Sequence, residues 1–192
     1  NVMSIKLSIP LTAVMLALAT PAISPVALAK TTVIVGGQEM FPSKTIVENA
    51  VNSADHTTLV TAVKTAGLVD TLSSKGPFTV FAPVNAAFAE LPSGTVETLL
   101  KPESKDKLTG ILTYHVVAGR ITSVDLKKRI KSGKGKAMLK TVAGGMLTAT
   151  MNGPNNVVVT DEGGNVANIT IYDVMQSNGV IHSIDHVLLP KS

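Results

Sequence analysis

The hydrophobic residues of this 192-residue chain change their spacing part-way along the sequence. Before Gly133 they recur at the helical positions i, i+3, i+4 and i+7, as Val47, Ala50, Val51 and Ala54 do. After Gly133 they alternate with polar residues, which is the spacing of a half-buried strand. Helices grouped early and strands grouped late predict an α+β fold with a largely antiparallel sheet.

The same patterns place the individual elements. They predict helices over residues 47–54, 56–66, 95–100, 103–115 and 123–132, and strands over 78–82, 137–142, 146–151, 156–160, 166–172 and 180–189. Turn residues, mostly Gly and Asn, separate the late strands. Three of the four phenylalanines lie between residues 78 and 88, so we expect this stretch to anchor the core.

Residues 1–29 have the pattern of a secretory signal peptide. Lys6 precedes an apolar stretch over residues 7–19, and Ala27-Leu28-Ala29 supplies a cleavage site. The alternative is an N-terminal membrane anchor, but the stretch contains Pro10 and is shorter than the ~20 apolar residues of a spanning helix. We therefore expect a cleaved signal peptide and an exported protein.

The signal peptide sets the expected domain organisation. Because the sequence starts at Asn1, we expect translation to begin at Met3 or upstream. After cleavage we expect a loose leader over residues 30–43, a single domain over 44–190 and no integral membrane span. The sequence does not predict an oligomeric state.

Composition excludes several classes of function. The chain has no cysteine, which rules out disulfides, thiolate metal sites and cysteine nucleophiles. It has no tryptophan and only two tyrosines, which argues against aromatic platforms for single-stranded nucleic acid or sugar rings. We find no Gly-x-Ser-x-Gly elbow, no Walker loop and no Gly-x-Gly-x-x-Gly motif after a strand. We therefore predict neither an enzyme nor a cofactor.

Three stretches together resemble the fasciclin-like domain family across residues 44–190. They are Phe78 to Phe88 (FTVFAPVNAAF), Tyr114 to Val117 (YHVV) and Ser177 to Pro190 (SNGVIHSIDHVLLP). The candidate structural residues within these motifs are Phe78, Phe81, Asn85, Phe88, Asn178, Gly179 and His182. Val84 departs from the family pattern, which usually has Thr there, and this puts a local turn hydrogen bond in doubt.

The resemblance implies a twisted β-wedge flanked by several short helices. It also implies an exported adhesion or matrix-interaction module, not an enzyme, like the single-domain secreted bacterial members. The expected partners are a cell-surface or matrix protein or an acidic polysaccharide. Nucleic acid is excluded as a partner because it lies in the wrong compartment. The expected location is the periplasm, the cell surface or the medium.

Two motif pairs are candidate partner-binding sites because animal relatives are reported to contact integrins there. The first pair is Tyr114 and His115. The alternative, which we favour, is a structural pair that closes a helix-to-strand corner, because His115 lies on the apolar stripe of its helix. The second pair is Asp173 and Val174, which occupies the slot of an Asp-Ile pair. The alternative is a solvated acid at a strand end.

A basic segment is the most distinctive feature outside the motifs. Seven cations and no acid lie within residues 127–140: Lys127, Lys128, Arg129, Lys131, Lys134, Lys136 and Lys140. Such a cluster attracts polyanions by a salt-sensitive field, and in an exported protein these are surface polysaccharide and anionic lipid head groups. The alternative is a solvated helix face followed by a loop.

The remaining titratable residues carry weaker predictions. His182 and His186 would lie roughly 13 Å apart on one strand, too far for a single metal ion, so we predict no metal site. We expect His56 at the surface, and Asp161 and Glu162 solvated in a turn. The alternative function is a periplasmic carrier of a small apolar ligand, which requires a cavity of several hundred Å³. A hydrolase would need Ser or Asp beside His115 or His182.

Overall fold

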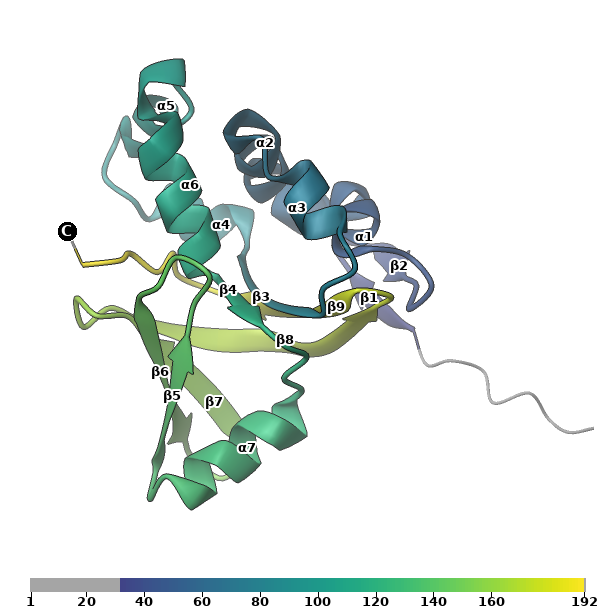
Figure 1. The fold of residues 1–192 in the computed structure, drawn as a ribbon, viewed down its shortest axis with the longest axis vertical. Helices are drawn as coiled ribbons and strands as arrows, with labels where there is room; N and C mark the ends of the chain where they lie inside the picture. Colours follow the sequence, from purple (N-terminus) through teal and green to yellow (C-terminus); the bar gives the residue numbers. More distant parts are fainter. Residues whose placement is uncertain (1–31, 192) are drawn as a thin grey trace, which may run out of the picture.

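The computed structural model describes residues 32–191, and these residues form an α+β domain. Figure 1 shows six helices gathered at one end of a twisted sheet and the seventh, α7, at the opposite end. The helices are α1 Ile46–Asn52, α2 Thr57–Ala66, α3 Val69–Ser73, α4 Asn85–Ala89, α5 Thr95–Leu99, α6 Lys105–Tyr114 and α7 Ser123–Ser132. Single 3₁₀ turns occupy Ala54–His56 and Pro102–Ser104.

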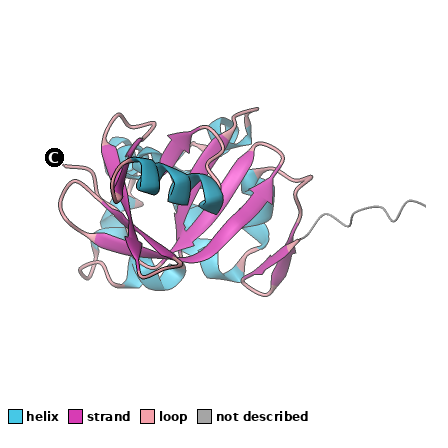
Figure 2. Ribbon diagram, turned by 90° about the horizontal axis from the view of Figure 1, so that it is seen from below, coloured by secondary structure: helices cyan, strands magenta, loops and turns pink. Residues whose placement is uncertain are grey.

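Seven strands form the main sheet, in the order β4-β3-β9-β8-β7-β6-β5. They are β3 Phe78–Pro83, β4 Val116–Ala118, β5 Lys136–Lys140, β6 Met146–Asn152, β7 Asn156–Thr160, β8 Val166–Gln176 and β9 Gly179–Ile184. Every neighbouring pair is antiparallel except β3 and β9, which confirms the prediction of a largely antiparallel sheet. In Figure 2, α7 lies in front of the strands and the other helices lie behind them.

The two outermost strands of this sheet almost meet. An isolated bridge joins Val117 to Thr141, and the Val142 N–H donates to the Val116 carbonyl at 2.8 Å. Near-closure leaves little free strand edge for unwanted pairing. The same contacts hold β4, which follows α6, against the end of β5.

Local sequence explains where the key helices start and stop. Thr45 and Glu48 form a capping box at the start of α1, and Thr122 and Asp125 form one at the start of α7. Gly67 ends α2 in the left-handed conformation, which costs glycine little. In β5 and β6 alternate side chains are buried, as the period-2 pattern predicts.

Two hydrophobic cores hold the domain together. One lies among α1–α6 and the adjoining faces of β3, β8 and β9. The other lies between α7 and the concave side of β5–β8, and contains Leu126, Ile130, Leu139 and Leu147. Phe81 is fully buried in the second core and Phe88 is buried in the first, while Phe78 is half-buried. The Phe-rich stretch therefore contributes to both cores, as expected.

The segment expected to be a loose leader contains ordered structure. Val33–Val35 (β1) and Gln38–Met40 (β2) form an antiparallel hairpin around Gly36 and Gly37, both of which have positive φ. Its Val35 and Met40 side chains are buried in the first core. The prediction failed because each strand has only three residues, too few for a periodicity signal. The predicted signal peptide, residues 1–29, lies outside the described residues.

Two other element boundaries differ from the prediction more than the rest do. β9 ends at Ile184 rather than at residue 189, and β8 continues to Gln176 rather than ending at 172. The chain after β9 turns away from the sheet, and its buried Leu188 packs into the second core instead. Helix α3 was not predicted, because its five residues bury only Leu72 and make little amphipathic pattern.

Candidate functional site

Tyr114 and His115 lie inside the domain, at the corner where α6 meets β4. The Tyr114 hydroxyl donates to the Met146 carbonyl at 2.7 Å and accepts from the Glu162 N–H at 3.1 Å. His115 Nε2 accepts from the Leu188 N–H at 3.0 Å, so Nδ1 carries the proton and donates to the Ile111 carbonyl. Both side chains are almost fully buried, which leaves no surface for a partner to contact without opening the fold.

Burial also determines the charge of His115. Desolvation lowers the pKa of the imidazole from 6.5 to about 4. The ring is therefore neutral at physiological pH, which its role as an acceptor for Leu188 requires. Tyr114 and His115 together connect α6 to β6, to the turn after β7 and to the C-terminal segment.

Asp173 lies within β8 and is engaged with α7, not solvated at a strand end as the alternative interpretation had it. It sits at an irregularity in the β8–β9 pairing and has φ of 55°. Its carboxylate accepts from the Ser123 N–H at 2.6 Å and from the Ser123 hydroxyl at 2.5 Å. It therefore stabilises the first turn of α7, where free N–H groups favour an acid. Its neighbour Val174 is buried in the first core.

His182 also stabilises the junction between β8 and the residues that precede α7. Its Nδ1 accepts from the Asp173 N–H at 3.2 Å, and its Nε2 donates to the Ile121 carbonyl at 2.8 Å. Burial lowers the pKa of this imidazole, which keeps it neutral. The residues leading into α7 are thus fixed by Asp173 and His182. Sequence reasoning missed this pairing, since Ser123 and Asp173 are 50 residues apart.

His56 is buried, contrary to the expectation of a surface position. Its two ring nitrogens hydrogen-bond the hydroxyls of Ser53 at 2.8 Å and Ser183 at 3.2 Å. Desolvation lowers its pKa as well. Both serines are buried, so this group joins the first helices to β9 and has no access for a substrate. A single histidine after an acid carried no periodicity signal that could have predicted its burial.

The candidate structural asparagines tie distant segments together. Asn85 accepts from the Thr58 N–H at 3.0 Å and donates to the Ala54 carbonyl at 2.9 Å. Asn178 accepts from the Ile46 N–H and donates to the carbonyls of Leu72 and Ser74. Each amide therefore satisfies several backbone groups at helix ends.

Gly179 and Val84 complete the motif residues. A Cβ at Gly179 would lie 2.1 Å from the Phe78 carbonyl oxygen, so only glycine allows β9 to approach β3 this closely. Val84 caps α4 without a side-chain hydrogen bond, as its departure from Thr predicted.

Asp161 and Glu162 hold the C-terminal segment and are not simply solvated. Asp161 is buried and accepts from the Gly163, Asn165 and Leu189 backbone N–H groups. Glu162 is exposed but accepts from the Met146 and Lys191 N–H groups. The expectation of a solvated acidic turn failed because the segment after β9 folds back over it.

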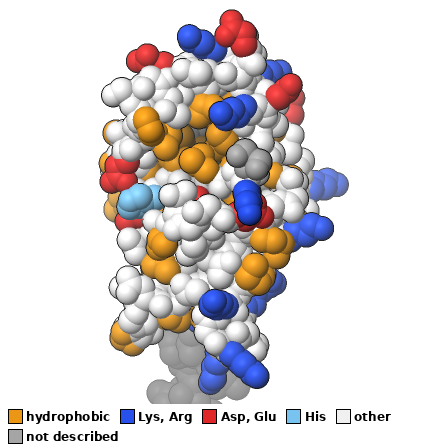
Figure 3. All heavy atoms as spheres, turned by 90° about the vertical axis from the view of Figure 1, so that its left-hand side faces the viewer, with side chains coloured by type: hydrophobic (Ala, Val, Ile, Leu, Met, Phe, Trp, Pro, Cys, Tyr) orange, Lys and Arg blue, Asp and Glu red, His pale blue; other side chains and the backbone are white. Residues whose placement is uncertain are grey.

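The basic segment, residues 127–140, lies on the surface at the α7 end. Six of its seven cations are exposed and Lys127 is half-buried. Within residues 32–191 none of them forms an ion pair with a carboxylate; the ion pairs there involve His186. In the lower part of Figure 3, Lys and Arg side chains appear without an acidic side chain among them. The segment thus presents positive charge to solvent.

The cations do not share one helix face. Leu126 and Ile130 point into the second core. At about 100° per residue, Lys127 and Arg129 then lie on the two flanks of α7 and Lys128 lies opposite the core. Lys136 and Lys140 belong to β5, on the side facing away from the core. The positive surface is therefore convex.

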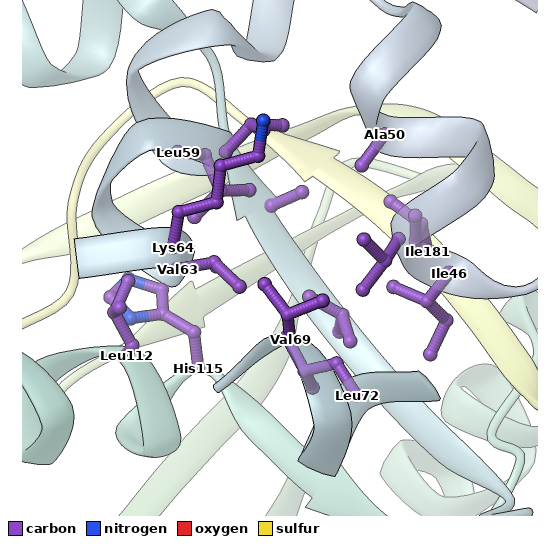
Figure 4. A pocket seen from close by; sticks show the side chains of 14 residues that line it. Ile46, Ala50, Leu59, Val63, Lys64, Val69, Leu72, Leu112, His115 and Ile181 are labelled. Atoms are coloured by element: carbon purple, nitrogen blue, oxygen red, sulfur yellow. The ribbon is translucent and has the colours of Figure 1, made fainter. Parts of the chain in front are cut away.

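The most enclosed apolar cleft of the described residues offers little room for a ligand, and the larger hollows, of about 340 to 550 Å³, are open to solvent. An apolar cleft between α1, α2, α3 and α6 has a volume of about 40 Å³, and Lys64 lies along it (Figure 4). This is far below the ~300–1,000 Å³ of small-molecule sites. Residues 32–191 contain no group of three or more His, Asp or Glu side chains that could hold a metal ion. Nor does any helix in that range have the length and apolarity to span a bilayer.

Comparisons with known proteins agree with this architecture. The family model for the fasciclin domain matches residues 54–190. Protein sll1483 of Synechocystis sp. is 44% identical over 180 residues, covering 94% of this chain and 92% of that protein. Immunogenic protein MPB70 of Mycobacterium bovis is 37% identical, over 74% of this chain and 67% of that protein.

A longer relative and a solved structure extend the comparison. Transforming growth factor-beta-induced protein ig-h3 of Sus scrofa is 34% identical over 70% of this chain, which spans 17% of that protein. A FAS1 domain pair from the insect cell adhesion molecule Fasciclin I superimposes with a TM-score of 0.69 at 21% identity, covering 77% of this chain and 51% of that one. On this evidence of sequence and fold, the chain belongs to the fasciclin domain family.

Proposed function

We propose that this chain is an exported, non-enzymatic adhesion module that binds acidic polysaccharide at a cell surface or in a matrix through its basic segment. The main support is that the segment's cations face solvent and form no ion pair with an acidic side chain among the described residues. The family supports the class of function, since the Fasciclin I whose fold it shares is an insect cell adhesion molecule. The signal-peptide pattern of residues 1–29 supports export.

The other candidate partner-binding residues are buried or already hydrogen-bonded, which favours the basic segment as the binding surface. Tyr114, His115 and Val174 are buried, and the Asp173 carboxylate is occupied by Ser123. Contact with a partner through these residues would require the domain to open. Three of the four histidines, His56, His115 and His182, are also buried and hydrogen-bonded, and the fourth, His186, is paired with Glu90 and Asp185. This supports a function based on surface contact rather than catalysis.

The physics of the basic segment predicts weak, multivalent and salt-sensitive binding. An exposed ion pair contributes about 0–1 kcal/mol, so no single cation suffices. Several cations acting on one polymer add their contributions, and each is screened beyond about 10 Å at 0.1 M salt. Affinity should therefore fall steeply as salt rises.

The test is binding of the protein to whole cells and to immobilised polygalacturonate across a series from about 0.05 to about 0.5 M salt. We expect Lys128→Glu/Arg129→Glu to weaken binding about tenfold at low salt, a change of about 1.4 kcal/mol. The matched control is Lys101→Glu/Lys107→Glu, two exposed lysines at the opposite, helical end. Neither pair touches a core, so both variants should unfold within about 0.5 kcal/mol of wild type.

Unchanged binding by Lys128→Glu/Arg129→Glu, or an equal loss in the control, would remove the basic segment from the function. Binding that persists at high salt would point instead to an apolar contact. The alternative of a carrier for a small apolar ligand has less support, because the enclosed apolar cleft is about 40 Å³ and the larger hollows, of about 340 to 550 Å³, are open to solvent.

A further inference from the structure

The face of the sheet that points away from the second core is not covered by a helix in the described part of the chain. Because alternate side chains of β5–β7 point inward, the others form this outer face. In Figure 1, α7 lies on the inner side of β5 and β6 and the remaining helices lie at the far end. Register places Lys136 opposite Thr150, and Thr148 between Met138 and Thr160. The outer face therefore combines two lysines and three threonine hydroxyls with the apolar side chains of Met138, Met146 and Val158.

Polar groups on this face are available to a partner. Within residues 32–191 the hydroxyls of Thr150 and Thr160 make no hydrogen bond, and both side chains are half-buried. Lys136 and Lys140 are exposed and lie about 13 Å apart along β5. The outward positions of β5, β6 and β7 carry no acidic residue. The face is thus complementary to an anionic, hydroxyl-rich molecule.

The turn between α7 and β5 joins this face to the cations of the helix. A Cβ at Gly133 would lie 1.9 Å from the Lys136 carbonyl oxygen, so the turn is tight. Lys134 occupies it with φ of 57°, a left-handed conformation that is unfavourable for a lysine. Gly or Asn would fit this position with less strain. The cations therefore follow a continuous path from α7, around Lys134, onto the outer face of β5.

The shape of this path discriminates between polyanions. Cations on the flanks and far side of α7 and on the outer face of β5 point in different directions. A flat bilayer can contact only one of these directions at a time, whereas a flexible chain can bend around the edge.

We infer that an acidic polysaccharide chain binds around the β5 edge. It contacts the α7 cations and Lys134 and then crosses the outer sheet face over Lys136, Lys140 and the threonine hydroxyls. This rests on the proposed function and extends it from the helix to the sheet.

The first test compares three charge-neutralising double variants of the protein. They are Lys136→Gln/Lys140→Gln on the sheet face, Lys128→Gln/Arg129→Gln on α7, and Lys101→Gln/Lys107→Gln as the control. The probes are polygalacturonate and vesicles that contain phosphatidylglycerol, both at low salt. We expect the sheet and helix variants each to weaken polygalacturonate binding about fivefold, and the control to match wild type. Vesicle binding should be weaker and insensitive to the sheet-face change.

The outcomes separate this inference from the proposed function. If the helix variant weakens polygalacturonate binding and the sheet variant does not, the function stands and the wrapped path is wrong. If neither variant weakens binding, both are wrong. Vesicle binding that is stronger than polysaccharide binding, and lost only in the helix variant, would identify a membrane surface instead.

Two further variants test the path by single substitutions rather than by neutralising a pair of cations. Lys134→Gly should raise the thermal unfolding midpoint, because it relieves the left-handed strain, and still weaken polygalacturonate binding. Thr150→Val removes a hydroxyl at nearly constant volume and should reduce binding without altering its salt dependence. Thr71→Val, at an exposed threonine of α3, is its control. Binding unchanged in both Lys134→Gly and Thr150→Val would overturn the path.

Discussion

The family motifs and the basic segment behave in opposite ways in this molecule. Residues that identify the family, such as His115, Asn178 and His182, are buried and hydrogen-bonded to backbone groups from distant elements. Residues peculiar to the basic segment, such as Lys128 and Lys136, are exposed and form no ion pair among the described residues. The difference shows that the motif residues of the family stabilise the fold of the domain. What the chain binds depends on surface residues that the signature does not include.

The largest expected effect on stability is that of Asn178→Ala. Removing the amide leaves the Ile46 N–H and the carbonyls of Leu72 and Ser74 without their partner in a buried position. We expect the free energy of unfolding to fall by about 4 kcal/mol, measured by urea denaturation followed by circular dichroism. The exposed Asn52→Ala, which removes one bond to Glu48, should cost less than about 0.5 kcal/mol. Similar costs for the two would break the comparison between interior and surface.

The next effect is a loss of stability in mild acid. His115 has a pKa of about 4 in the folded protein against 6.5 when unfolded, so between these values the unfolded chain binds the extra proton. Its contribution is fully present above pH 6.5 and is lost as pH falls towards 4, by up to about 3 kcal/mol. His56 and His182 shift in the same direction.

Urea midpoints measured across this pH range check the acid prediction. His186 opposes it, because its bond to Asp185 raises its pKa, but its side chain is 45% exposed and solvent screening keeps the contribution small. His186→Gln should therefore keep the acid slope, and His115→Asn should flatten it. An identical slope in wild type and His115→Asn would contradict the assignment to His115.

The smallest expected effect is that of replacing Gln176, a buried residue that directly precedes the motif at Ser177–Pro190. Both polar atoms of the Gln176 side chain are buried without a hydrogen-bond partner in the described part of the protein. Such a group costs stability, so Gln176→Met, of similar shape, should raise the free energy of unfolding by about 1 kcal/mol. Urea denaturation of the two proteins decides it. A decrease would show that the amide is satisfied by ordered water and follows the same rule as the other motif residues.

Sequence patterns predicted the elements that have enough residues to show a period. Helices α2, α6 and α7 and strands β5–β7 lie within a few residues of their predicted positions. The hairpin β1–β2 and helix α3 were missed, because three to five residues carry too little periodicity. Motif resemblance, rather than periodicity, supplied the family.

Side-chain environments were harder to predict than elements. The burial of His115 followed from its place on an apolar stripe. The burial of His56 and Asp161 and the contact of Asp173 with Ser123 depend on partners far away in the sequence. No local pattern contains that information. The basic segment was visible at once, because charge clustering is a property of sequence alone, but its division between α7 and β5 required the fold.

The parallel pairing of β3 with β9 has a consequence for when this protein can fold. This pairing joins Phe78–Pro83 to Gly179–Ile184, which lie about a hundred residues apart in the sequence. Contacts this distant close large loops and make folding slow. Strand β9 is also the last of the seven strands in chain order, so the sheet cannot be completed until all of its other strands have been synthesised. Until β9 is made, β3 and β8 lack the strand that lies between them, so completion of the sheet waits for its last strand.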